Sequence, residues 1–571
     1  MKKCLTRLAC LLLCAILGCA PLGDTVSMHL YAYLGRDMPT SSVARTDLTF
    51  SELPFDPVDP AALRDQIEAL LIQIMEADDA SAPPLQAALE ELYGEAEALE
   101  SMASLAYVHH CLDVTDALWA SRSNRLNASL DSIYAALNDA ALRLSSFPSL
   151  RKIYPPETVR LLQASVSLYA PAVQPLLDRE TELMDAYDAL EQTLFVTLDG
   201  EAWTEARIES DTSLPFASWY AIRKAYDAAY AEAAAELYSE LIALRRQIAE
   251  TLGFASYPAY RYAVYGRDYV PSDSARFCDS VQSVLVPLFR RALQDTAADR
   301  EVLLLTEGNR TAEETLAAVA DVIAQIDPRL SEPWTYLITH ELYDCSIAET
   351  KLSGSYTTFF STYGAPFLYV SWDGSYEMPT TLLHEFGHFA AYYRRGSASV
   401  SLDLAEAQSQ ALELLAFPCY ADFYGNRADE ARAVKRCDLL YAIASGCLID
   451  AFEQAAYAMD DPTAEALQET FGQLCRAYGL DDAGFTADTW TRIPHLFRAP
   501  SYYISYALGA VTALELYQLS LKHSKTAAAR YWMLLGAEGT DRAAVLKRCG
   551  LMDSLSDAAV QTVAALWAEQ P

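Results

Sequence analysis

The chain has 571 residues, 52% hydrophobic and 11% aromatic, which is ample for a packed core and excludes a disordered polymer. The formal net charge of −35 excludes nucleic acid and anionic lipid surfaces as partners, because this charge would repel them. The same charge favours cationic or zwitterionic ligands, including basic peptides, although acidity that serves only solubility explains it equally well.

The first 20 residues have the pattern of an export signal. Three basic residues within the first seven precede an apolar run over 8–17, which is too short to span a membrane. The run ends in Ile-Leu-Gly-Cys, which resembles the lipobox of bacterial lipoproteins. This resemblance implies that Cys19 carries lipid and anchors an extracytoplasmic bacterial protein to the cell membrane. The alternative is an ordinary cleaved signal with an incidental cysteine.

The cysteine spacing argues against a cysteine-based metal site. Of the 12 cysteines, Cys19 and three others belong to the signal region, and the remaining eight include no C-x-x-C pair. An even number of cysteines in an exported chain permits disulfides, and buried free thiols are the equal alternative.

Most of the chain after the signal has the pattern of helices. Residues 19–59 are rich in Pro, Asp, Ser and Thr and predict a tether. From 60 to 200, stretches such as 85–105 have helical periodicity and are separated by Pro-containing breakers. A break at 198–203 precedes a strongly helical run over 219–252.

One segment predicts a β-strand. Residues 366–372 are aromatic and β-branched, and Asp373-Gly374 ends them in a turn. If this strand lies at an exposed sheet edge it can pair with an extended peptide, and the alternative is a buried structural strand. Helices resume at Thr380, so we expect a mostly α fold with a small β-sheet.

The sequence TTLLHEFGHFAAYY at 380–393 contains an H-E-x-x-H match, and a threonine at its start is expected to cap the helix that carries it. His384 and His388 are four residues apart and share one helix face, where two neutral imidazoles can hold one Zn²⁺. Glu385 lies beside them, where it can take a proton from an attacking water. A near match at His340, with Asp in place of the second histidine, shows that half-matches also occur by chance.

Glu406 is the candidate third ligand. It lies 18 residues after His388 on an amphipathic run, and a short reversal between them would let two helices pack antiparallel with Glu406 over the histidines. Glu413, seven residues further on the same face, can accept the outer N–H of a ligand histidine. The alternatives are a surface glutamate for Glu406 and a salt bridge for Glu413.

A second polar segment lies about a hundred residues downstream. His495 is in a Pro-flanked loop, and Pro500 fits the first turn of a helix that carries Tyr502, Tyr503 and Tyr506. Neutral phenol and imidazole donors suit the oxyanion that develops in peptide hydrolysis. Tyr506 can share a helix face with either of the other two tyrosines, so the choice between them stays open. Many of the 35 tyrosines must be core or surface residues.

These segments together resemble the M3 family of zinc oligopeptidases, particularly its oligoendopeptidase F branch. HEFGH followed by Glu406-x-x-Ser409-x-x-x-Glu413 is similar to the family's ligand helices. The similarity continues upstream through the predicted strand and downstream through IPHLFRAPSYYISY, and covers roughly 220–550. Gln410 stands where thermolysin-like enzymes have an aspartate, which argues against those enzymes.

The resemblance implies a zinc metalloendopeptidase that hydrolyses internal bonds of oligopeptides, with one Zn²⁺ per chain and Glu406 as third ligand. It implies Glu385 as general base and proton donor, and it gives the oxyanion to His495 and Tyr506, then to Tyr503. It also implies a large helical ellipsoid with a deep substrate channel that excludes folded proteins. We expect a monomer that meets the membrane only through its lipid anchor.

Two departures from the family are visible. The spacing between His388 and Glu406 is shorter than expected, so the connection between the two helices is trimmed. Family members are mostly cytosolic, whereas this chain has an export signal. Neither departure removes a chemical group from the site, but the second makes the substrate uncertain.

We therefore predict a signal peptide over 1–18, a lipidated cysteine and tether over 19–59, an N-terminal helical region over 60–200 and a catalytic region over 201–571. Two rivals remain. A carboxypeptidase of the M32 type has a similar ligand segment, although the YYISY segment argues against it. A non-catalytic peptide-binding lipoprotein is the other, and the presence of Glu385 beside intact ligands argues against that.

Overall fold

The protein was analysed as a computed structural model, which describes residues 44–569 except 157, 160, 161, 164, 165, 167–171, 212, 306–310, 397–399 and 540. The expected signal peptide, Cys19 and the first part of the expected tether lie outside the described residues.

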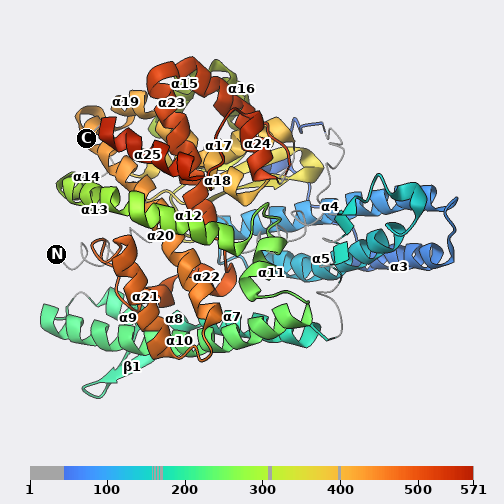
Figure 1. Ribbon diagram of the computed structural model, residues 1–571, viewed down its shortest axis with the longest axis horizontal. Helices are drawn as coiled ribbons and strands as arrows, with labels where there is room; N and C mark the ends of the chain where they lie inside the picture. Colours follow the sequence, from blue (N-terminus) through green and yellow to red (C-terminus); the bar gives the residue numbers. More distant parts are fainter. Residues whose placement is uncertain are drawn as a thin grey trace.

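Three long N-terminal helices form an arm that projects to the right in Figure 1: α3 (Pro60–Glu76), α4 (Ala82–Leu112) and α5 (Ala117–Leu144). On α3, Leu63, Ile67, Leu70 and Ile74 recur at intervals of three and four residues, so one face of the helix is apolar and buried. These side chains pack against α4 and α5 in a hydrophobic core of their own. The arm joins the main body because the last turns of α4 belong to the main core.

The main body is built from the remaining helices around one large core. Its first half contains α7 (Gln174–Asp188), α8 (Leu190–Thr193), α9 (Glu205–Ser210), α10 (Phe216–Thr251), α11 (Tyr257–Val264), α12 (Pro271–Val284), α13 (Val286–Asp295), α14 (Ala297–Leu305), α15 (Ala312–Ile326) and α16 (Ser331–Thr339). Its second half contains α17 (Met378–Arg395), α18 (Leu402–Leu415), α19 (Tyr420–Tyr424), α20 (Ala428–Ala458), α21 (Ala464–Tyr478), α22 (Pro494–Arg498), α23 (Ile504–Leu535), α24 (Arg542–Arg548) and α25 (Asp557–Glu569).

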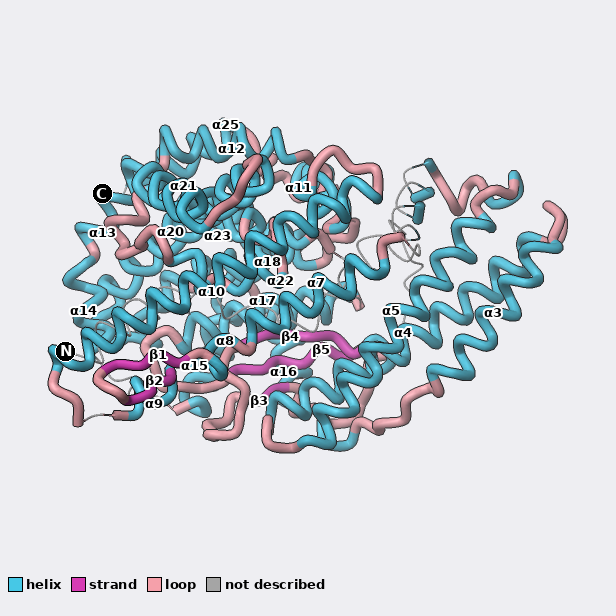
Figure 2. The backbone as a smooth tube through the Cα atoms, turned by 90° about the horizontal axis from the view of Figure 1, so that it is seen from below, coloured by secondary structure: helices cyan, strands magenta, loops and turns pink. Residues whose placement is uncertain are grey.

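A small sheet lies against α17, as the magenta strands of Figure 2 show, and its strands are β3 (Tyr343–Asp344), β4 (Ser355–Phe360) and β5 (Ala365–Val370). The order is β3-β5-β4, with β5 parallel to β3 and antiparallel to β4. Since β5 is central and buried at every position, the strand predicted from the sequence is a structural strand, and β4 takes the edge position instead. A separate hairpin pairs β1 (Phe195–Leu198) with β2 (Glu201–Thr204).

The helix that carries the histidine motif begins earlier than the sequence predicts. Glu377 occupies the N-cap position and Pro379 lies in the first turn. The hydroxyls of Thr380 and Thr381 donate to the Glu377 carbonyl, so neither threonine caps the helix and that prediction is wrong. The predicted class, mostly α with a small sheet beside this helix, is confirmed.

The described part of the expected tether, 44–59, is attached to the body. The Thr46 amide donates to the Tyr363 carbonyl at 2.9 Å, and the Phe50 amide donates to the His340 carbonyl at 3.1 Å. Any free linker must therefore precede this segment.

The cysteines of the described chain and its most apolar helical stretch lie in the interior of the fold. The eight cysteines of the described chain are buried free thiols. Among the described residues, one stretch, Leu402–Ala458, is long and apolar enough to cross a membrane. However, 78% of its most apolar part is buried inside the fold. Burial of this kind is typical of a core helix.

Candidate metal centre

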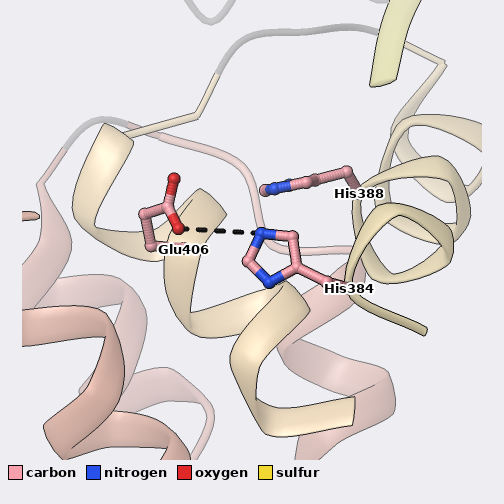
Figure 3. Close-up of side chains that lie close together, drawn as sticks. All are labelled: His384, His388 and Glu406. Carbon is pink, nitrogen blue, oxygen red and sulfur yellow. Dashed lines mark ion pairs between the residues drawn. The ribbon is translucent and has the colours of Figure 1, made fainter. Parts of the chain in front are cut away.

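Two neighbouring helices bring His384, His388 and Glu406 together. Figure 3 shows the two imidazoles projecting from α17 toward the carboxylate on α18. One ligand atom from each side chain lies within 4.8 Å of the others, and His384 Nε2 is 3.9 Å from Glu406 Oε2. Such a group can hold a metal ion.

A glycine allows these two helices to approach closely. A Cβ atom at Gly387 would lie 2.6 Å from the Ser409 Cα and 3.0 Å from the Gln408 carbonyl oxygen. Any larger residue would therefore push α18 away from α17 and carry Glu406 away from the histidines. The glycine inside HEFGH thus has a packing role beside the ligand role of its neighbours.

The surroundings of the Glu406 carboxylate show whether these residues suit a cation. Glu406 is 2% exposed, and its Oε1 accepts a hydrogen bond from the Tyr502 hydroxyl at 3.2 Å. Its Oε2 has no hydrogen-bond partner among the described residues. A buried carboxylate oxygen without a partner is costly, and a metal ion between Glu406 and the histidines would satisfy it. Burial also lowers the pKa of His388 well below its usual value, which keeps this imidazole in the neutral form that binds metals.

A half-buried lysine and a buried glutamate orient the first histidine. The Nδ1 of His384 is hydrogen-bonded to Glu413 Oε1 at 2.8 Å, and Lys435 from α20 forms an ion pair with the other carboxylate oxygen of Glu413. Although burial opposes it, Lys435 and His384 hold the pKa of Glu413 below its usual value. The sequence offered two roles for Glu413, a contact with a candidate ligand histidine and a salt bridge. In the structure Glu413 has both contacts. Its bond to Nδ1 leaves the Nε2 of His384 facing Glu406.

Glu385 lies in the same site but is not part of the ligand group. It is 1% exposed, and the Thr357 hydroxyl on β4 donates to its Oε2 and to its backbone carbonyl, both at 2.9 Å. Burial raises the pKa of Glu385 to about 8, although His384 and Thr357 oppose the shift. A carboxylate with a raised pKa at a fixed position is suited to proton transfer near neutral pH.

The downstream polar segment reaches the site through its tyrosines. Tyr506 and Glu385 both line one cavity beside the histidines, whereas the Tyr502 hydroxyl donates a hydrogen bond to Glu406. His495 packs against these rings, with ring centroids 4.9 Å from Tyr503 and 6.2 Å from Tyr506. Burial lowers the pKa of His495 to about 4, so it is neutral at physiological pH. Neither His495 nor Tyr503 is among the residues that line this cavity.

One cavity of about 300 Å³ adjoins the ligand group. Ligand pockets of enzymes have volumes of about 300–1,000 Å³, so a segment of a small substrate fits. Besides Glu385 and Tyr506, it is lined by residues at the start of β4, along α17 and along the facing side of α20.

Two residues of this site were not singled out from the sequence. Thr357 lies in a short strand without a motif, and Lys435 lies in a helix whose sequence, ADEARAVKRCDLL, has the pattern of a solvated face. No sequence signal identifies either one, because their roles depend on contacts between distant elements.

Comparison with known proteins shows what this fold is similar to. The chain matches no protein-family model and no curated protein. Among solved structures it is similar to a protein assigned as an oligoendopeptidase F, with 22% identity, a TM-score of 0.74 and coverage of 92% of this chain and 99% of that one. PZ peptidase A with an inhibitor matches with 22% identity, a TM-score of 0.74 and coverage of 91% and 99%. A carboxypeptidase from Pyrococcus furiosus matches less well, with 13% identity, a TM-score of 0.57 and coverage of 83% and 97%. The chain therefore has the fold of these peptidases.

Proposed function

We propose that this protein is a zinc-dependent endopeptidase that hydrolyses internal bonds of oligopeptides. The proposal is carried by one observation: two half-buried histidines and a buried glutamate lie together beside a cavity that a second buried glutamate, Glu385, also lines. The fold that this chain shares with the peptidases named above supports the same proposal.

His384, His388 and Glu406 would hold the metal, with Glu413 and Lys435 fixing the orientation of His384. Bound there, Zn²⁺ would act as a Lewis acid that polarises the substrate carbonyl and makes water a stronger acid.

Glu385 would take the proton from the attacking water and pass it to the leaving amine. Thr357 holds the carboxylate through Oε2, which leaves Oε1 for the water. Tyr506, as a neutral phenol lining the cavity, would donate to the oxyanion. His495 would support this donor through the cluster of rings that it forms with Tyr503 and Tyr506.

An extended peptide can bind at β4, which has a strand partner on one side only in the described sheet. Gly354 and Ser355, at the start of β4, line the cavity. Backbone pairing with this edge would bind many peptides with little demand on their side chains.

The proposal is tested with an internally quenched peptide that is acetylated at its N-terminus and amidated at its C-terminus. We expect wild type loaded with zinc to cleave this peptide internally. Mass spectrometry of the products identifies the cleaved bond. Glu385→Gln should lower kcat by about a thousand-fold or more, because it removes the base and the acid of the reaction. The matched control is Glu91→Gln, on the exposed face of α4, which should be indistinguishable from wild type. A Glu385→Gln variant as active as wild type would refute the proposal.

The same peptide separates the rivals. An obligate carboxypeptidase cannot process an amidated C-terminus, so internal cleavage excludes it. A non-catalytic binding protein would bind the peptide and leave it intact.

For location we propose an anchored extracytoplasmic protein, on the basis of the lipobox-like segment that ends at Cys19. Cys19→Ala should release the protein from membranes in a fractionation experiment. A variant that stays membrane-bound would contradict the anchor.

A further inference from the structure

The cavity beside the metal-ligand group continues along α17 toward its N-terminus. Thr381, Thr380 and Glu377 precede His384 by three, four and seven residues, so all lie on the helix face that carries the ligands. Seven residues are two helical turns, or about 10 Å along the axis. The cavity therefore reaches well beyond the reacting centre, over a distance that a long side chain can span.

A carboxylate without a cationic partner lies at this far end. No Lys, Arg or His of the described chain lies within ion-pair distance, 4.0 Å, of Glu377. Burial, and then the nearby Asp438, raise the pKa of Glu377 to about 7. Glu377 lines the cavity together with Arg300 of α14 and Lys435 and Asp438 of α20.

The two cations near Glu377 are already paired. Arg300 forms an ion pair with Asp438, and Lys435 forms one with Glu413. These four charges cancel in pairs. Among the described residues, Glu377 and the exposed Asp373 are then the carboxyl groups of the cavity wall, away from the candidate ligands and Glu385, that form no ion pair. The field at this end of the cavity therefore favours a positive group.

An uncharged polar group in the cavity wall also lacks a partner. The amide oxygen of Gln410, on a side chain 7% exposed, accepts no hydrogen bond from the described residues. A buried acceptor without a donor is costly, so this wall is suited to a ligand that brings N–H groups.

Part of the cavity wall is apolar. Met378 on α17 and Val434, Leu439 and Ala442 on α20 line the cavity. The aliphatic stem of a lysine or arginine packs well on such walls while its charged end reaches a carboxylate.

We propose that this part of the cavity is a subsite for a lysine or arginine side chain of the peptide substrate, and that Glu377 selects it. The proposal rests on the proposed peptidase function and adds the substrate class. It also gives the strong acidity of the chain a role, because a net charge of −35 draws basic peptides toward the molecule.

The first test is a digest of a peptide library blocked at both ends. Wild type should enrich lysine and arginine at one fixed position relative to the cleaved bond. Two matched peptides with lysine or norleucine at that position then measure selectivity, because norleucine keeps the stem and removes the charge. We expect kcat/KM to be about ten- to a hundred-fold higher for the lysine peptide, as for loss of one charged hydrogen bond.

Substitution of Glu377 should abolish this selectivity. In Glu377→Gln the lysine-to-norleucine ratio should fall to about one, and a circular dichroism spectrum like that of wild type shows that the variant is folded. Glu377→Arg should instead favour aspartate or glutamate at the same position. The control Glu91→Gln should keep the wild-type ratio. An unchanged ratio in Glu377→Gln, or no enrichment in the library, would overturn the proposal.

A binding measurement separates this proposal from the proposed function. Titration calorimetry of Glu385→Gln with the two matched peptides requires no cleavage. Tighter binding of the lysine peptide, lost in Glu385→Gln/Glu377→Gln, supports the subsite even if wild type cleaves nothing. Equal affinities, or no binding of either peptide, would overturn the subsite even if wild type is an active peptidase.

Discussion

Lys435 and Glu413 illustrate how single residues outside the ligand group prepare the candidate metal centre. Glu413 is 2% exposed, and it takes part in a hydrogen bond with a ligand imidazole and an ion pair with a lysine. Removal of either partner would leave the other charge buried and alone. The arrangement therefore fixes which nitrogen of His384 faces Glu406.

Glu413→Gln should weaken zinc binding by about ten- to a hundred-fold, because an amide is a poorer acceptor for the histidine and a poorer partner for Lys435. Competition with a chromophoric chelator measures the affinity directly. Glu91→Gln is the control and should bind zinc as wild type does. Wild-type affinity in Glu413→Gln would mean that its contact with His384 has no effect on the metal.

At the residue scale, the sequence predicts the candidate site residues that lie close to one another along the chain. His384, Glu385 and His388 follow from one helical motif, and Glu406 follows from the next amphipathic run. The contacts of Thr357 depend on a strand that pairs elsewhere in the chain, so no local pattern indicates them. Helical periodicity leaves open which of Tyr502 and Tyr503 faces the substrate. In the structure the Tyr502 hydroxyl donates to Glu406, and neither tyrosine is among the residues that line the cavity.

At the scale of elements, close helix packing positions Glu406, the candidate third ligand. A Cβ at Gly509 of α23 would lie 2.7 Å from the Glu406 Cβ and 3.0 Å from its carbonyl carbon. The helices α17 and α23 thus press on α18 through glycines from two sides. Glu406 lies between them and has little freedom to move.

Gly509→Ala should destabilise the fold by about 1–3 kcal/mol and weaken zinc binding, because the new methyl group must displace the backbone at Glu406. The control is Gly94→Ala in the exposed middle of α4, where a Cβ meets nothing within 4 Å. That change should stabilise the protein by about 0.5–1 kcal/mol. Chemical denaturation measures both, and equal effects of the two substitutions would contradict the packing argument.

A buried glutamate holds the turn that precedes Tyr502 and Tyr506. Ser501 has a φ of 65°, in the left-handed region, and its amide donates to both oxygens of Glu453 at 2.8 and 2.9 Å. This bond stabilises a backbone conformation that serine rarely adopts.

Glu453→Ala should lower kcat/KM by about ten- to a hundred-fold while the zinc affinity falls little, because the tyrosine segment shifts and the ligands do not. Glu453→Gln retains one acceptor and should recover most of the activity. Equal activity of wild type and Glu453→Ala would show that the turn needs no anchor.

Long helices were predictable and short strands were not. Periodicity over many residues identifies α4, and helix propensity identifies α10. The strands β1 and β2 are four residues each: β2 lies mostly in the predicted break at 198–203, and β1 lies in the region predicted to be helical. Their connection, Asp199-Gly200, has positive φ at both residues, as a tight hairpin turn requires. The turn signal was present in the sequence, but such short strands contain too few alternating positions to reveal a face.

At the scale of the whole molecule, an acidic chain encloses several carboxyl groups that ionise with difficulty. Burial raises the pKa of Glu97 and Glu377 to about 7, and that of Glu385 and Glu453 to about 8. In the unfolded chain each has a pKa near 4.3. At pH values between the unfolded pKa and the raised folded pKa of each group, the folded protein therefore binds more protons than the unfolded chain.

The free energy of unfolding of the metal-free protein should therefore fall as the pH rises from 6.5 to 8, by at least about 2 kcal/mol. Buried histidines such as His495, whose pKa is lowered to about 4, offset only part of this fall, because each gains only about 0.4 kcal/mol above pH 6.5 as the unfolded chain loses its proton. Urea titrations with a chelator present measure the profile. A flat or rising profile over this window would contradict the assigned burial of these carboxyl groups.

The most direct test of the central claim is a titration of metal-free protein with Zn²⁺ while cleavage of the doubly blocked peptide is recorded. We predict that activity rises linearly and saturates at one zinc per chain. Glu385→Gln should bind the same single zinc and stay inactive, because the ligands are intact and the base is absent. Wild type that is saturated with zinc and cleaves nothing, or activity that does not depend on zinc, would contradict the account.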